Sequence, residues 1–94
     1  MAPKRLSDSD VQAALADLDG WERDGDAIRK SFARSSFPDA IAFVVQVGFI
    51  AEAANHHPDI DIRWRNVGLL LTTHDAGGLT ELDVQLAAKF DAIV

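Results

Sequence analysis

The 94-residue chain contains no cysteine, so it can form neither a disulfide nor a thiolate metal site. Basic residues are also scarce, since 9 lysines and arginines stand against 15 aspartates and glutamates, for a formal net charge of -6. Binding to nucleic-acid phosphates needs a basic surface, so we expect no direct nucleic-acid binding. A Gly-rich phosphate loop and a Gly-x-Ser-x-Gly motif are absent too, which argues against nucleotide-binding and serine-hydrolase chemistry.

Long apolar segments are missing as well. The longest, around residues 41–54, contains Gln46 and Glu52 and is shorter than the roughly 20 residues that span a bilayer. Lys4 and Arg5 are not followed by an apolar stretch, so no secretory leader is expected. A chain of this length holds one hydrophobic core, and we predict a single domain over residues 1–94 in a soluble, cytoplasmic protein with no membrane contact.

Capping residues and periodicity indicate three helices and four strands. The first helix should begin at the capping residue Ser7, with Asp10 three positions later, and end at Gly20. The long second helix should begin near Ser36 and stop before Pro58. The remaining predicted elements are strands over residues 21–23, 27–33, 60–64 and 67–73 and a last helix capped by Thr80.

The order helix, hairpin, helix, hairpin, helix predicts an α+β fold. We expect a four-stranded antiparallel sheet covered on one face by helices, in the order α-β-β-α-β-β-α. In the second hairpin, Ile60, Ile62 and Trp64 alternate with polar residues, so this strand should be half-buried. A turn is predicted at Arg65-Asn66.

The three histidines all occur in the second half of the sequence. His56 and His57 stand at the exit of the long helix, and His74 ends the last strand, before the loop at residues 75–78. An antiparallel hairpin would bring residues 57–58 and His74 to the same end of the sheet. Imidazole titrates near neutrality, so two such histidines can divide into an acid and a base.

Carboxylates stand where they could tune these imidazoles. Glu52 is one helical turn before His56, so the two should share a helix face, while Asp75 adjoins His74 and Asp83 opens the last helix.

Each of these residues also has an ordinary structural interpretation. The His-His-Pro exit is compatible with simple helix termination, and Asp83 with a capping box. Glu52 is compatible with a solvated helix face, and Trp21 and Trp64 with the core. The histidines could also hold a metal, although neighbouring histidines seldom point at one ion.

The spacing of these residues resembles the signature of the pterin-4a-carbinolamine dehydratases. The pattern is Glu52, three residues, His56-His57-Pro58, five residues, Trp64, nine residues, His74, eight residues and Asp83. Thr73-His74-Asp75 and Gly78-Leu79-Thr80 are similar to a second block of the family, and Trp21 to a tryptophan near its N-terminus. Ile60 departs from the family pattern, in which many members have an aromatic residue, and this affects only the lining of the pocket.

The resemblance implies dehydration of 4a-hydroxytetrahydropterin to quinonoid dihydropterin, without metal or dissociable cofactor. It implies catalysis by His56 and His74 as acid and base, with His57 orienting the ring or replacing the acid. The implied substrate-binding residues are Pro58, Thr73, Asp75, Ala76 and Trp21, and the implied supporting residues are Glu52, Asp83 and Trp64. Which histidine is the acid stays open.

The resemblance also implies a homo-oligomer, because the family forms dimers and tetramers. The apolar long helix and the three leucines Leu69, Leu70 and Leu71 favour self-association independently. The alternative function is a non-catalytic binding, assembly or dimerisation protein on the same fold. Relatives of that kind are expected to lose signature histidines, and this chain has all of them.

Overall fold

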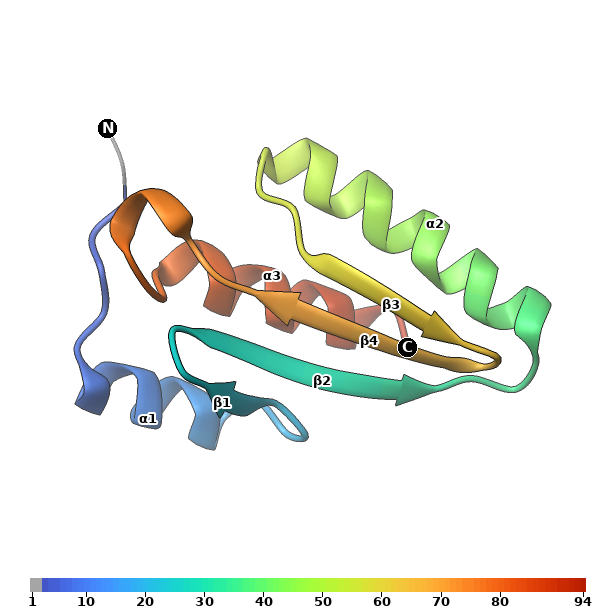
Figure 1. Ribbon diagram of the computed structural model, residues 1–94, viewed down its shortest axis with the longest axis horizontal. Coiled ribbons are helices and arrows are strands. Elements are labelled where there is room, and N and C mark those ends of the chain that lie inside the picture. The colour runs from blue at the N-terminus through green and yellow to red at the C-terminus, as the bar shows by residue number, and fades with distance from the viewer. Residues whose placement is uncertain (1–2) are drawn as a thin grey trace.

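The two predicted hairpins pair into one antiparallel sheet (Figure 1). The computed structural model describes residues 3–94, so Met1 and Ala2 of the predicted domain, and the leader prediction that involves them, lie outside the described residues. The elements are α1 (Asp8–Ala16), β1 (Glu22–Asp24), β2 (Ala27–Ala33), α2 (Phe37–Ala54), β3 (Asp59–Arg63), β4 (Asn66–Leu71), the short 3-10 helix η1 (His74–Ala76) and α3 (Glu81–Ala92). The predicted α+β order is confirmed.

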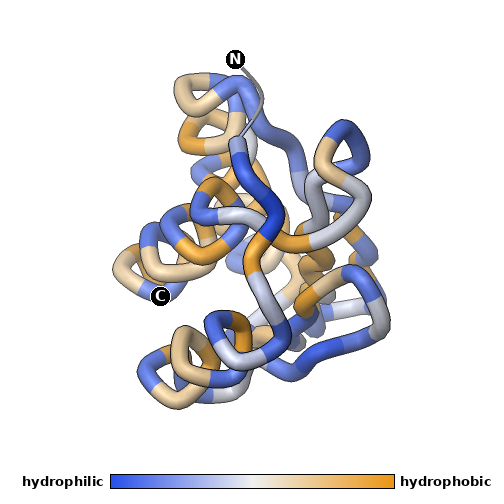
Figure 2. The backbone as a smooth tube through the Cα atoms, turned by 90° about the vertical axis from the view of Figure 1, so that its left-hand side faces the viewer, coloured by the Kyte–Doolittle hydropathy of each residue, from blue (hydrophilic) through white to orange (hydrophobic). Residues whose placement is uncertain are grey.

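The strands lie in the order β1-β2-β4-β3, and every neighbouring pair is antiparallel. β2 and β4 are therefore central, whereas β1 and β3 are the edge strands. Figure 2 shows the helices along one side of the molecule and the strands along the other. The sheet is thus covered on one face only, as predicted.

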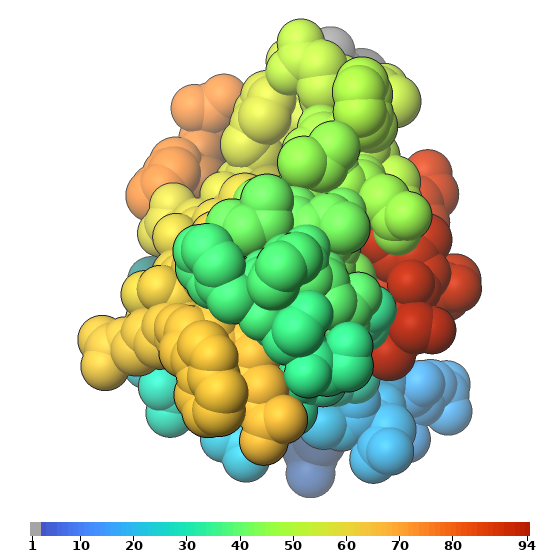
Figure 3. Space-filling view, turned by 90° about the vertical axis from the view of Figure 1, so that its right-hand side faces the viewer, coloured from blue at the N-terminus to red at the C-terminus, as the bar shows by residue number. Residues whose placement is uncertain are grey.

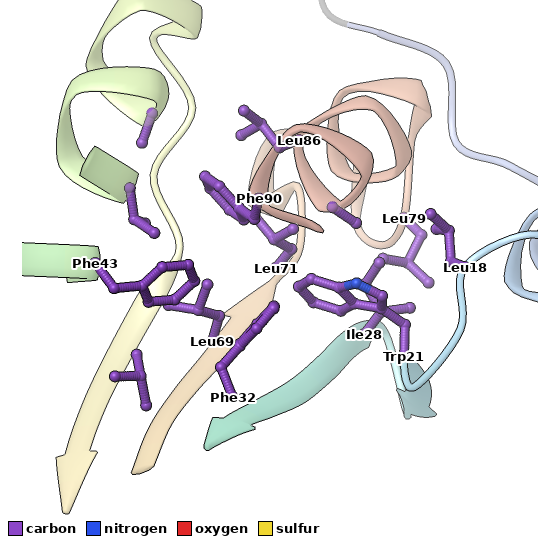
Figure 4. Close-up of a cluster of buried hydrophobic side chains, with 14 of the residues drawn as sticks. Leu18, Trp21, Ile28, Phe32, Phe43, Leu69, Leu71, Leu79, Leu86 and Phe90 are labelled. Atoms are coloured by element: carbon purple, nitrogen blue, oxygen red, sulfur yellow. The ribbon is translucent and has the colours of Figure 1, made fainter. Parts of the chain in front are cut away.

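The core lies between the sheet and α2 and α3 (Figure 4). Alternate residues of the central strands supply one side of it, because side chains two apart on a strand share a face. Those of the sheet are Ile28, Phe32, Val67, Leu69 and Leu71, and those of the two helices are Ala40, Phe43, Val47, Ala51, Leu86, Ala87 and Phe90.

Local caps set both ends of α2 and the start of α3 where the sequence predicted them. The Ser36 hydroxyl accepts a hydrogen bond from the Asp39 amide at 3.1 Å and so begins α2. Asn55 ends it in the left-handed conformation, with φ of 50°, three residues before Pro58. Thr80 and Asp83 form a complete capping box at the start of α3.

α1 ends earlier than predicted. Its last helical residue is Ala16, and the chain then tightens through a bond from the Leu18 amide to the Leu15 carbonyl. Leu18 is buried in the core from this turn, and not from the helix. Gly20, with φ of 83°, serves the turn into β1 and does not cap the helix.

The predicted turn of the second hairpin is displaced by one residue. Arg63 pairs with Asn66, so Trp64 and Arg65 form a two-residue turn, and Trp64 has φ of 55°. Trp64 is therefore 67% exposed, with the Arg65 guanidinium 4.7 Å from its ring centroid, and it is neither a strand nor a core residue. The prediction of a half-buried strand was also too strong, because Ile60 is 42% exposed on an edge strand.

α2 is longer than the apolar segment read from the sequence. It has 18 residues with a mean hydropathy of 1.5, so by length and composition it could cross a membrane, contrary to the prediction from the shorter segment. One of its faces nevertheless packs on the sheet through Ala40, Phe43, Val47 and Ala51. Such packing is consistent with a soluble protein, and a cytoplasmic location stays a prediction.

Candidate active site

The three histidines lie at one end of the β3–β4 hairpin. His56 and His57 follow the left-handed Asn55 at the end of α2, and His74 begins η1 after β4. Asp59 pairs with Leu70 in the antiparallel register, so the residues before β3 and those after β4 are at the same end of the sheet. The predicted convergence of the two segments is confirmed.

His56 is paired with a buried carboxylate. Its Nε2 atom lies 2.6 Å from Oδ1 of Asp83, and the side chains are 12% and 0% exposed. The pair connects the end of α2 to the first turn of α3. Because a carboxylate only accepts hydrogen bonds, we assign the ring proton to Nε2, which leaves Nδ1 as an acceptor when the imidazole is neutral.

The second carboxylate oxygen of Asp83 is also fully engaged. Oδ2 accepts from the Thr73 hydroxyl at 2.8 Å and from the Thr80 amide at 2.9 Å. Asp83 is therefore a capping-box residue and the partner of His56 at once, one role for each oxygen. The two interpretations left open by the sequence do not exclude each other.

Glu52 pairs with His57 and not with His56. Its Oε1 atom lies 2.8 Å from Nε2 of His57, and both side chains are largely exposed. The prediction that Glu52 and His56 share a helix face is therefore wrong. Asn55 leaves the helix in the left-handed conformation, so the four-residue spacing of an α-helix no longer applies beyond it.

His74 is exposed at the first position of η1. It lines a hollow of about 290 Å³ together with Thr72, Gly77, Gly78, Asp26 and Ala27. Asp75 is exposed beside it, whereas Ala76 is half-buried and donates its amide to the Thr73 carbonyl at 3.1 Å. Pro58, also half-buried, leads into β3.

The two tryptophans are not brought to the histidines. Trp21 is 4% exposed in the core, and its indole nitrogen donates to both carboxylate oxygens of Asp91, at 3.1 and 3.2 Å. Asp91 lies eight residues beyond Asp83 on α3, which is about 12 Å along the helix. Trp64 lies at the other end of β3 from Pro58. The structure thus gives Trp21 the core position that the sequence left open, and not the substrate-binding position that the resemblance implied.

Sequence reasoning missed the side-chain roles of two threonines. Thr73 was expected only to bind substrate and Thr80 only to cap the last helix, yet their hydroxyl oxygens lie 2.9 Å apart and both residues are buried. A signal was available for Thr73, because Leu69, Leu71 and Thr73 alternate and so share the core face of the sheet.

A shared metal site is not assembled from these groups. Within residues 3–94, no three histidine, aspartate or glutamate side chains are grouped so that they could hold one ion. His56 and His57 are instead directed to separate carboxylates. Acid/base chemistry at the two imidazoles is what this arrangement can support.

Comparisons with known proteins agree in one family. The sequence profile of the family described as pterin 4 alpha carbinolamine dehydratase matches residues 4–93. A protein of Roseiflexus sp. (strain RS-1), provisionally named a pterin-4-alpha-carbinolamine dehydratase, is 63% identical over 96% of this chain and 97% of its own. A protein of Chloroflexus aurantiacus with the same provisional name is 53% identical over 96% and 97% of the two chains.

Solved structures share the fold. The crystal structure of a transcriptional coactivator/pterin dehydratase from Brucella melitensis superimposes with a TM-score of 0.92 at 38% identity, over 96% of this chain and 98% of that one. A pterin dehydratase-like protein identified as a RuBisCO assembly factor in the alpha-carboxysome gives a TM-score of 0.64 at 24% identity, over 78% and 84% of the chains, and shares the fold alone. The chain therefore belongs to the pterin-4a-carbinolamine dehydratase family.

Proposed function

We propose that this protein dehydrates 4a-hydroxytetrahydropterin to quinonoid dihydropterin by histidine acid/base catalysis, as a soluble cytoplasmic enzyme in tetrahydropterin recycling. Membership of the family supports the activity. The single observation that supports the mechanism is the pair of His56 with the buried carboxylate of Asp83, at 2.6 Å, at the same end of the hairpin as His74.

The reaction needs one proton delivered and one removed. The carbinol hydroxyl leaves as water once an acid has protonated it, and the C–O electrons depart with the oxygen. A base takes the proton of the adjacent ring nitrogen, whose electrons then form the carbon–nitrogen double bond. Each positioned group of this kind accelerates a reaction by about 10²–10⁴-fold.

We assign the base to His56 and the acid to His74. Asp83 accepts the Nε2 proton of His56, so the carboxylate would stabilise the imidazolium formed when Nδ1 takes a proton. His74 is exposed and can be reprotonated from solvent after each turnover. His57, held by Glu52, would orient the ring, and the backbone from Thr73 to Ala76 would bind the edge of the pterin.

The proposal is tested by following the decay of chemically generated 4a-hydroxytetrahydropterin with and without the protein. We expect an acceleration that saturates with substrate. The control is a double variant, His56→Gln with His74→Gln, at the same concentration, because it corrects for catalysis by other surface groups. Equal rates for parent, double variant and buffer would instead favour the alternative, a non-catalytic binding or assembly protein on this fold.

A further inference from the structure

A chain of buried hydrogen bonds extends behind the Asp83 carboxylate. The Leu82 amide donates to the Thr80 hydroxyl at 3.3 Å, the Thr80 and Thr73 hydroxyls are 2.9 Å apart, and the Thr73 hydroxyl donates to Asp83 at 2.8 Å. Thr73, Thr80 and Asp83 are 6%, 0% and 0% exposed. The polar atoms of these three side chains must therefore form their hydrogen bonds with protein groups, because water does not reach them.

Only one direction of donation is compatible with this chain. The carboxylate has no proton to give, so Thr73 donates its single hydroxyl proton to Oδ2 of Asp83. Thr73 must then accept from Thr80, whose own oxygen accepts from the Leu82 amide. With the Thr80 amide as a second donor to Oδ2, the carboxylate is fixed in orientation and presents Oδ1 to His56.

Thr73 is connected to the His74 turn as well, through its backbone. Its amide donates to the Gly78 carbonyl at 3.0 Å, and its carbonyl accepts from the Gly78 and Ala76 amides at 3.3 and 3.1 Å. These bonds close the turn from which His74 projects. Thr73 thus contacts the partner of one histidine with its side chain and shapes the backbone that carries another.

We propose that Thr73 is a positioning residue whose hydroxyl orients Asp83 so that His56 is held as its Nε2–H tautomer, in register with His74. The catalytic consequence rests on the proposed function, whereas the tautomer itself does not. Thr73 need not touch the reacting atoms, since it acts through Asp83 and through the turn.

The test replaces the hydroxyl while keeping the shape of the side chain. In Thr73→Val the methyl group remains and a second methyl replaces the hydroxyl, so Asp83 loses one donor and Thr80 loses its acceptor. Thr73→Ser retains the hydroxyl and should restore the chain. For the state of the His56 ring the matched control is Thr72→Val, because the neighbouring hydroxyl donates to the Asp26 carbonyl at 2.6 Å and takes no part in this chain.

Two measurements are needed, the nitrogen NMR signals of the His56 ring and the steady-state kinetics of dehydration. We expect Nε2–H alone in the parent, in Thr73→Ser and in Thr72→Val, and a mixture of tautomers in Thr73→Val. In Thr73→Val kcat should fall by about 10–100-fold with KM nearly unchanged, as for other residues that orient a catalytic group.

Two results would overturn the proposal. One is an Nδ1–H tautomer at His56 in the unaltered protein, a measurement that needs no variant to fold. The other is a folded Thr73→Val whose ring signals match those of the parent. If the parent does not dehydrate the pterin, the proposed function fails, but the ring signals still decide whether Thr73 positions His56.

Discussion

His74 is the histidine whose removal should separate catalysis from folding. It is exposed at the start of η1, so His74→Ala should lower the free energy of unfolding by well under about 2 kcal/mol. Losing a positioned proton-transfer group should slow dehydration by about 10²–10⁴-fold. A thermal melt and a dehydration assay on the same variant measure both effects. A greatly lowered melting temperature would make His74 a structural residue, and a stable, fully active variant would remove it from the mechanism.

The two histidine–carboxylate pairs should differ sharply in their contribution to stability. Asp83→Asn leaves one oxygen to accept from the Thr80 amide and the Thr73 hydroxyl, but it presents an NH2 donor to His56, so the Nε2 proton of His56 loses its acceptor. We expect the free energy of unfolding to fall by about 1–3 kcal/mol. Glu52→Gln, at an exposed pair, should change it by less than about 0.5 kcal/mol. Urea unfolding of both variants measures these free energies. Equal decreases in the free energy of unfolding for Asp83→Asn and Glu52→Gln would contradict the prediction.

Activity should not depend on a metal ion. His56 and His57 contact different carboxylates, and no metal-binding group of three such residues occurs in residues 3–94. Dialysis against a strong chelator should therefore leave the dehydration rate unchanged. A loss of rate that zinc restores would show instead that the histidines bind a metal.

At the scale of elements, the first turn of α2 contains Asp39, whose ionisation should change the stability of the fold at acidic pH. The Ser35 amide donates to Asp39 at 3.0 Å, and with the Arg34 side chain and the Ser35 hydroxyl it lowers the pKa of Asp39, although burial opposes this. Because the pKa of Asp39 is lower in the folded than in the unfolded state, the ionised carboxylate stabilises the fold at pH values above the unfolded-state pKa of about 3.9. This stabilisation is lost as the pH falls through the folded-state pKa.

Asp39→Asn should therefore be less stable than the parent at pH 7, and the difference should shrink as the pH falls below about 4. Chemical unfolding of both proteins between pH 7 and 2 measures it. The amide keeps the size of the side chain, so packing at the start of α2 is little changed. A stability difference that stays constant down to pH 2 would show that the Asp39 charge contributes nothing.

Helix boundaries could be predicted where a capping residue or a proline marks them in the sequence. Ser36, Pro58 and Thr80 mark helix boundaries through their own backbone chemistry, so α2 and the start of α3 could be predicted. Trp64 could not be placed, because bulky residues rarely adopt positive φ and nothing in the sequence marks it as a turn residue. The end of α1 was missed because Leu18 continues the helical spacing but is buried from a turn.

For the site, the sequence predicted the meeting of two segments but not the pairing of side chains. The hairpin register brings His56 and His74 to one end, and alternation along strands is enough to foresee it. The partner of each histidine depends on the left-handed turn at Asn55, which places His57, and not the predicted His56, beside Glu52. The Thr73–Thr80 contact depends on how closely α3 approaches the sheet, which no local pattern encodes.

At the scale of the whole molecule, α2 has an apolar face that the sheet does not cover. Its exposed large side chains recur every four residues and so form one stripe along the helix. They are Phe37, Ile41, Val45 and Phe49. In Figure 3 the N-terminal half of α2 (green) forms a ridge on this side of the molecule, beside the turn between β3 and β4. Of the leucines expected to add to an interface, only Leu70 is turned away from the core and half-buried.

We predict that the protein self-associates through this stripe. Exposed apolar patches of this kind commonly mark interfaces, and a second copy of α2 would bury the stripe, including Phe49, which is 75% exposed. Light scattering at micromolar concentration should return a mass well above the 10.2 kDa of one chain.

Val45→Lys with Phe49→Lys should lower that mass, because two buried lysine charges would oppose association. Gln85→Lys, exposed on α3, should leave it unchanged. A parent mass of one chain would reject self-association, and an undiminished mass in the double variant would place the interface elsewhere.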